Sequence, residues 1–85
     1  MAKRNRLEII RDILIIIGES HNSIKLTPLL RKSNLSSKRF YQYLEELISK
    51  RFIVKIESQI KLTEKGKSYL EKYSSIIGFI DEFGL

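Results

Sequence analysis

The stretch from Leu26 to Phe52 constrains the fold of this chain more than any other, because it predicts two helices separated by a tight turn. The turn is expected at Ser33–Leu35. Ser36 is suited to cap the second helix, since its hydroxyl can accept a hydrogen bond from a first-turn N–H. In that helix, apolar residues recur at the spacing of one amphipathic face that packs on a core, and these residues are Phe40, Leu44, Leu47 and Ile48. The pattern predicts a helix-turn-helix unit whose second helix covers about residues 37–50.

The charges of this second helix are arranged against its dipole. Lys38 and Arg39 lie in the first turn, where the dipole disfavours positive charge, and the anions Glu45 and Glu46 come later. A helix adapted only for its own stability would carry them in the opposite order. Cations combined with a tyrosine and a glutamine suit a helix whose N-terminal half enters the major groove of DNA. The alternative interpretation is an exposed polar face that is only solvated.

The chain is small and basic. Its 85 residues allow one domain, residues 1–85, and its formal net charge of +6 favours an acidic partner. Nucleic acid is the usual partner of this kind, and an anionic membrane surface is the second. Thirteen Lys and Arg against six Asp and Glu precede Leu62, whereas three against four follow from Leu62 onward. The basic part and the nearly neutral C-terminal part are therefore expected to contact different partners.

Several absences narrow the class of protein further. The sequence has no cysteine, so it offers neither disulfides nor thiolate metal sites, and an intracellular location is the simplest inference. The longest apolar run, Ile13–Ile17, has five residues, whereas a membrane-spanning helix needs roughly 20. The amino terminus lacks the apolar region of a signal peptide. We therefore expect a cytoplasmic protein without a membrane partner.

The residues before the helix-turn-helix unit predict a helix and a short strand. Leu7–Ile17 has helical periodicity, and Gly18 is placed to end that helix. Ile24–Leu26 could form a short strand. Thr27 is then expected to cap the first helix of the unit, Pro28–Ser33, because proline suits the first helical position.

The residues after the unit predict a β-hairpin and a final helix. Phe52–Ile56 and Ile60–Leu62 are β-rich runs on either side of a polar tip. Thr63 is expected to cap a helix over about residues 64–83.

The final helix is a candidate for dimerisation. Its apolar positions repeat with the spacing of a coiled-coil seam, and so much apolar surface is not expected on a lone helix in water. The predicted interface consists of Leu70, Tyr73, Ile76, Ile77, Ile80 and Phe83. The alternative is that this helix folds back over Ile9 and Ile16 of the first helix.

Helix, short strand, helix-turn-helix, β-hairpin and final helix is the element order of a winged helix-turn-helix domain. The chain resembles the small archaeal winged-helix DNA-binding proteins, a group that includes basic chromatin-associated proteins. The resemblance covers about Lys3 to Tyr73 and is carried by the segments KRNRLEIIRDIL, NLSSKRFYQYLEELISKRFIV and KLTEKGKSYLEKY. It implies a mostly helical α+β fold with a three-helix core, a hairpin wing and a C-terminal helix. It also implies that the final helix pairs with that of a second copy.

The candidate DNA-binding residues fall into two groups. The groove-facing set is predicted to be Ser37, Lys38, Tyr41 and Gln42, because glutamine can pair with adenine and lysine can reach guanine acceptors. Contacts to phosphate are expected from Arg39, Arg31, Lys32, Lys55, Lys61, Arg4 and Arg6, with Lys3 in the same basic head. Simpler roles compete with the second group: cations complement a helix end, hairpin lysines keep a sheet edge soluble, and basic termini often fray without binding anything.

The sequence gives no sign of catalysis. His21 is the single histidine and has no cysteine or second histidine to share a metal. No nucleophile set, carboxylate pair or Gly-rich phosphate loop is present, so no enzyme activity, metal, cofactor or small-molecule ligand is expected. The leading hypothesis is a nucleoid-associated, double-stranded DNA-binding protein, either a transcription regulator or a chromatin-type protein. The alternative is a winged-helix protein-interaction module that uses its apolar tail, residues 76–83.

Overall fold

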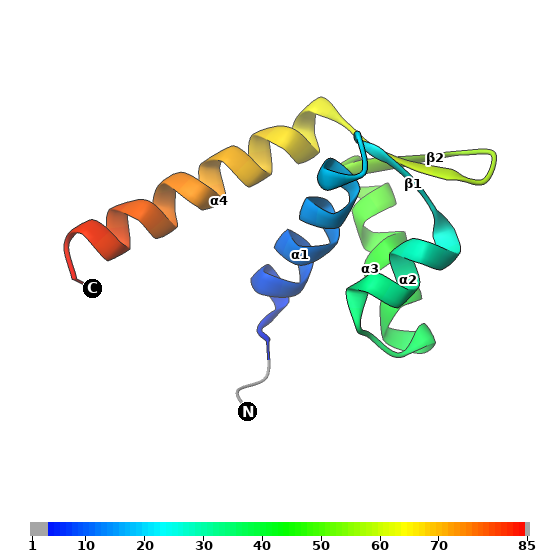
Figure 1. The fold of residues 1–85 in the computed structure, drawn as a ribbon, viewed down its shortest axis with the longest axis horizontal. Coiled ribbons are helices and arrows are strands. Elements are labelled where there is room, and N and C mark those ends of the chain that lie inside the picture. Colours follow the sequence, from blue (N-terminus) through cyan, green and yellow to red (C-terminus); the bar gives the residue numbers. More distant parts are fainter. Residues whose placement is uncertain (1–3, 85) are drawn as a thin grey trace.

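The computed structural model describes residues 4–84 and contains four helices and three strands in this part of the chain. In order they are α1 (Arg6–Glu19), β1 (Ser23–Lys25), α2 (Leu26–Ser33), α3 (Ser37–Ser49), β2 (Ile53–Ile56), β3 (Gln59–Leu62) and α4 (Glu64–Glu82). Helix α1 occupies the middle of the molecule, with α2, α3 and the hairpin on one side of it and the projecting α4 on the other (Figure 1). This is the α+β architecture that the sequence predicted.

The sheet is antiparallel, with strand order β1-β3-β2. Ile24 pairs with Ile60, and Ile60 pairs in turn with Lys55 of β2. Strands β2 and β3 form the hairpin wing, whose tip is Glu57 and Ser58. Glu57 has a φ of 58°, in the left-handed region, which lets the chain reverse over two residues.

One apolar core joins α1, α2, α3 and the inner face of the sheet. Ile9 is only 2% exposed although it lies off the main apolar stripe of α1, because α1 is covered on more than one side. The buried apolar residues are Ile9, Ile10, Ile13, Leu14, Ile17, Ile24, Leu29, Phe40, Leu44, Leu47, Ile53 and Ile60. Helix α4 contributes only partly buried side chains, Tyr69 and Leu70, to this core.

Helix α1 departs from its predicted ends. At its start, Asn5 and Glu8 form a capping box: the Glu8 N–H donates to Asn5 Oδ1 at 2.8 Å, and the Asn5 N–H donates to Glu8 Oε1 at 3.2 Å. At its end, the helix continues through Gly18 to Glu19. The reversal instead falls at His21 and Asn22, which have φ values of 60° and 64°.

Helix α2 begins earlier than predicted. Thr27 is not its cap: the helix starts at Leu26, and the capping position, Lys25, makes no side-chain hydrogen bond. Lys25 is also the last residue of β1, where it pairs with Gln59, so the chain passes directly from strand into helix. Pro28 is tolerated because first-turn N–H groups have no partner within the helix.

The predicted caps of α3 and α4 are confirmed. The Arg39 N–H donates to Ser36 Oγ at 3.3 Å, and the Gly66 N–H donates to Thr63 Oγ1 at 3.1 Å. The Thr63 N–H also donates to the carbonyl of Phe52 at 3.1 Å, which fixes the start of α4 against the start of β2. Helix α4 runs without interruption through Gly78.

Candidate nucleic-acid interface

Helix α3 presents its predicted groove-facing residues to solvent. Its buried side consists of Phe40, Leu44 and Leu47. The five predicted contact residues of the helix are all exposed: Ser37, Lys38, Arg39, Tyr41 and Gln42. Within residues 4–84, Lys38 and Arg39 form no ion pair. These cations are therefore available to an anionic partner.

Tyr41 is the one aromatic side chain of this exposed set. It is 43% exposed, and its ring meets that of the buried Phe40 edge-on, with 5.4 Å between the centroids and 74° between the planes. Such edge-to-face packing is favourable and restricts the ring. Tyr41 thus offers a partly apolar surface held by the core.

The two glutamates of α3 differ in their surroundings. Glu46 pairs with Arg6 of α1 and with Lys50, whose Nζ lies 3.0 Å from Glu46 Oε2. Glu45 is exposed and has no ion pair among the described residues. The fold therefore neutralises one of the two negative charges that could oppose a phosphate backbone.

The wing places its two lysines on opposite faces of the sheet. Lys55 lies opposite the buried Ile60, and Lys61 lies opposite Val54, so Lys61 is on the outer face. Both lysines are exposed. An open hollow separates the wing from the start of α2, and Lys55 lines it together with Lys25, Thr27 and Ser58.

Lys25 is a candidate that sequence reasoning missed. It borders the hollow beside Lys55 and is exposed, yet nothing in its local sequence marks it as a binding residue. Its position follows from the pairing of β1 with β3, which joins residues far apart in the chain. The local sequence shows only a cation in a short predicted strand just before a predicted helix, which is too general to identify a binding residue.

Arg31 and Lys32 are exposed in the last turn of α2, where their charges complement the helix dipole. Asn34 ends the helix in the left-handed conformation, with a φ of 58°. These two cations remain free of ion pairs within residues 4–84. The geometry is compatible with both roles that the sequence suggested.

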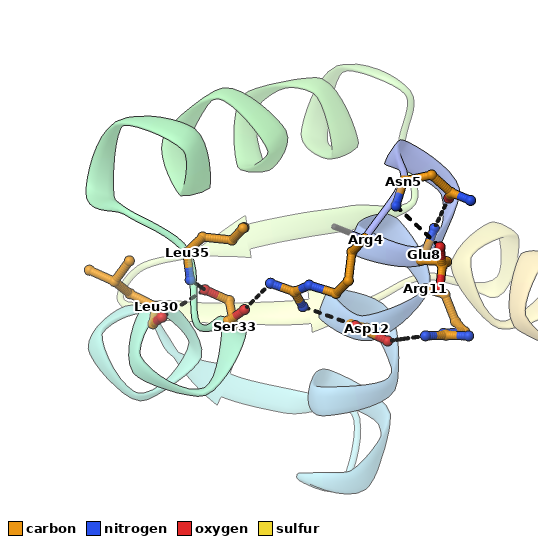
Figure 2. Close-up of polar contacts among 8 residues, drawn as sticks. All are labelled: Arg4, Asn5, Glu8, Arg11, Asp12, Leu30, Ser33 and Leu35. Atoms are coloured by element: carbon orange, nitrogen blue, oxygen red, sulfur yellow. Dashed lines mark hydrogen bonds and ion pairs between the residues drawn. The ribbon is translucent and has the colours of Figure 1, made fainter. Parts of the chain in front are cut away.

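The basic head does not extend as a free arm over the residues that the structure describes. Arg4 Nη1 lies 2.9 Å from Asp12 Oδ2, and Arg4 Nη2 donates to the carbonyl of Ser33 at 2.9 Å (Figure 2). Arg6 pairs with Glu46. Both arginines thus bind other elements of the domain, which differs from the fraying terminus expected from the sequence. Lys3 lies outside the described residues.

The predicted dimer interface divides into two parts. Leu70 and Tyr73 are half-buried against α1, where the Arg11 guanidinium lies 5.4 Å from the centroid of the Tyr73 ring. Ile80 is also half-buried. The remaining three side chains are exposed: Ile76 at 59%, Ile77 at 40% and Phe83 at 62%. Phe79, 57% exposed, extends the same surface, so the described chain does not cover the distal half of α4.

Two other kinds of site, a metal centre and a membrane-spanning helix, are absent from the described residues. Residues 4–84 contain no group of three His, Cys, Asp or Glu side chains arranged to hold a metal ion, and His21 is exposed. Within the same range no helix combines the length and the apolar character that crossing a bilayer requires.

Helices α2 and α3 with the β2–β3 wing define a winged helix-turn-helix domain. The family model described as "winged helix-turn-helix" matches residues 3–80, and the chain belongs to this family. An uncharacterized protein of Methanocaldococcus jannaschii is 40% identical over 74 residues, which cover 87% of this chain and 71% of the relative. A second uncharacterized protein of that archaeon is 32% identical over 79 residues, covering 93% of this chain but only 36% of the relative.

Proposed function

We propose that this chain is a double-stranded DNA-binding protein without catalytic activity, acting as a transcription regulator or a chromatin-type protein. The observation that supports this most is the composition of the exposed face of α3. There, Lys38 and Arg39 form no ion pair within residues 4–84 and lie beside Tyr41 and Gln42, away from the buried row of the helix. A stable helix has no internal reason to carry these cations in its first turn.

In this proposal the N-terminal half of α3 enters the major groove. Gln42 pairs with adenine and Lys38 reaches the acceptors of guanine, while Tyr41 offers an apolar contact. Arg39 contacts phosphate. Glu45 keeps the C-terminal half of the helix away from the phosphate backbone.

The wing and α2 supply contacts that do not depend on sequence. Lys55 and Lys61 on the wing, with Arg31 and Lys32 at the end of α2, bind phosphates. Phosphate contacts provide most of the affinity of such proteins and position the helix that reads the bases. Arg4 and Arg6 are secondary candidates, because an anion would compete with their internal partners.

The proposed active form is a homodimer through the distal half of α4. The exposed apolar side chains of that half, Ile76, Ile77 and Phe83, support this proposal, because the described part of the chain leaves them uncovered.

Replacing Lys38 and Gln42 by alanine should reduce discrimination between duplex sequences, because each base contact contributes about 1–3 kcal/mol of discrimination. Lys61→Ala should instead weaken all duplexes alike and reduce the salt dependence by about one phosphate. The two effects are measured as the affinities for two duplexes: a preferred one, selected by the wild-type chain from random sequence, and an unselected random one.

Lys72→Ala is the matched control for Lys61→Ala, since it removes the same charge from an exposed position on α4. It should leave the salt dependence of duplex binding close to that of the wild type. The assignment of reading and anchoring roles fails if the α3 and wing variants change both duplexes by the same factor.

A further inference from the structure

Ser33 is the last residue of α2, at the start of the turn to α3, and is the one buried polar residue of the described chain, with 1% of it exposed. Its hydroxyl donates to the carbonyl of Leu30 at 2.7 Å and accepts from the N–H of Leu35 at 3.3 Å. Neither bond uses the Ser33 carbonyl, which faces outward from the turn toward Arg4 (Figure 2). Since α3 starts four residues further on, at Ser37, the position of this turn sets the direction of α3.

Arg4 holds that outward carbonyl from another part of the chain. Its guanidinium lies between the turn and α1, with Nη2 on the Ser33 carbonyl and Nη1 on Asp12, each at 2.9 Å (Figure 2). The side chains of Arg4 and Asp12 are 32% and 26% exposed, so the pair is partly shielded from water. A planar guanidinium can hold two acceptors at once in a fixed geometry, which an ammonium cannot reproduce.

Asp12 is the acceptor that orients Arg4. Its second oxygen, Oδ1, accepts from Arg11 Nε at 2.9 Å and Arg11 Nη2 at 2.7 Å. Burial is the largest influence on this carboxyl and by itself raises its pKa, but the hydrogen bonds from Arg4 and Arg11 prevail, so that the pKa of Asp12 lies below its ordinary value. Arg11 also packs over Tyr73 of α4. Through Arg11 and Arg4, the Asp12 carboxylate is therefore linked both to α4 and to the turn between α2 and α3.

We propose that Asp12 and Arg4 are positioning residues for DNA recognition: Asp12 holds Arg4 on the Ser33 carbonyl and thereby fixes the orientation of α3 relative to the wing. This inference rests on the proposed function. It assigns to an acidic residue of α1 a positive effect on the binding of an anion. Simple charge counting assigns the opposite effect, because removing a negative charge from a basic protein strengthens binding to DNA.

The test compares Asp12→Asn with Glu19→Gln, an exposed residue at the end of α1 that has no ion pair within residues 4–84. Both changes remove one negative charge. The measured quantity is the ratio of the affinities for a duplex selected by the wild-type chain and for a random duplex. This ratio is insensitive to partial unfolding, since an unfolded fraction lowers both affinities by the same factor.

Asp12→Asn should lower the ratio about fivefold to tenfold, a typical size for the loss of a contact that acts at a distance, and Glu19→Gln should leave it unchanged. Arg4→Lys provides a second variant without any change of net charge. It should lower the ratio in the same direction, because lysine can keep a phosphate contact but cannot bridge Asp12 and Ser33.

Two results would overturn the inference and are distinguishable. If the wild-type chain binds both duplexes equally, or if it discriminates between them while Asp12→Asn matches Glu19→Gln and Arg4→Lys matches the wild type, the positioning role is wrong and the proposed function stands. If the wild-type chain binds no duplex, the proposed function is wrong, and the inference that rests on it is wrong as well.

Discussion

Replacing Gly66 by alanine is expected to lower the free energy of unfolding by roughly 1–3 kcal/mol, a large share of the stability of a domain of this size. A Cβ atom at this position would overlap the carbonyl oxygen of Phe52 and lie 2.7 Å from Cδ1 of Leu62. The Phe52 carbonyl cannot move away freely, because it accepts a hydrogen bond from the N–H of Thr63, which joins the residue before β2 to the residue before α4. The added methyl group must therefore displace the start of α4 from the sheet.

Urea unfolding followed by circular dichroism measures this effect at fixed protein concentration. Gly78→Ala is the matched control, since a Cβ there meets nothing within 4 Å. Within an exposed helix this change should leave stability unaltered or increase it by up to about 1 kcal/mol. Equal unfolding midpoints for the two variants would show that the close contact at Gly66 is not what fixes α4.

Introducing glutamate at both Ile76 and Phe83 is expected to convert a dimer into a monomer. Both side chains are largely exposed in the single chain, at 59% and 62%, so their loss removes nothing from the core. At an interface, burying two carboxylates in place of two apolar anchors costs several kcal/mol. The dissociation constant should therefore rise by at least about a hundredfold.

Sedimentation equilibrium over a range of concentrations measures the mass, which should fall from twice 10.0 kDa to 10.0 kDa. Ser75→Glu adds one carboxylate at an exposed position that is not among the six predicted interface residues and should leave the dimer intact. A wild-type chain that is monomeric throughout would refute the dimer. It would also favour the alternative in which the apolar tail binds a different protein.

Features set by neighbouring residues were predictable from the sequence. The cap of α3 by Ser36 and that of α4 by Thr63 depend on side chains one turn away, and both are confirmed. The burial of Phe40, Leu44 and Leu47 follows from the periodicity of a single helix. Because these features fix α3, the exposure of its polar face was also predictable.

Features that depend on residues distant in the chain were not predictable from the sequence. The start of α2 is decided by the pairing of Lys25 with Gln59, and this register is not visible in the local sequence. Arg4 reaches the Ser33 carbonyl across 29 positions of the chain. Local rules also placed the end of α1 at Gly18, whereas the reversal uses left-handed His21 and Asn22.

The most direct test of the account is the salt dependence of duplex binding by the wild-type chain. If the lysines and arginines of α2, α3 and the wing contact about six to ten phosphates per dimer, the logarithm of the association constant should fall linearly with the logarithm of salt concentration, with a slope of about −5 to −9. Fluorescence anisotropy of a labelled random duplex from roughly 50 to 300 mM salt covers the range where this change is large. An association constant that does not change with salt, or no binding at the lowest concentration, would contradict the proposal that this winged helix-turn-helix domain binds the DNA backbone.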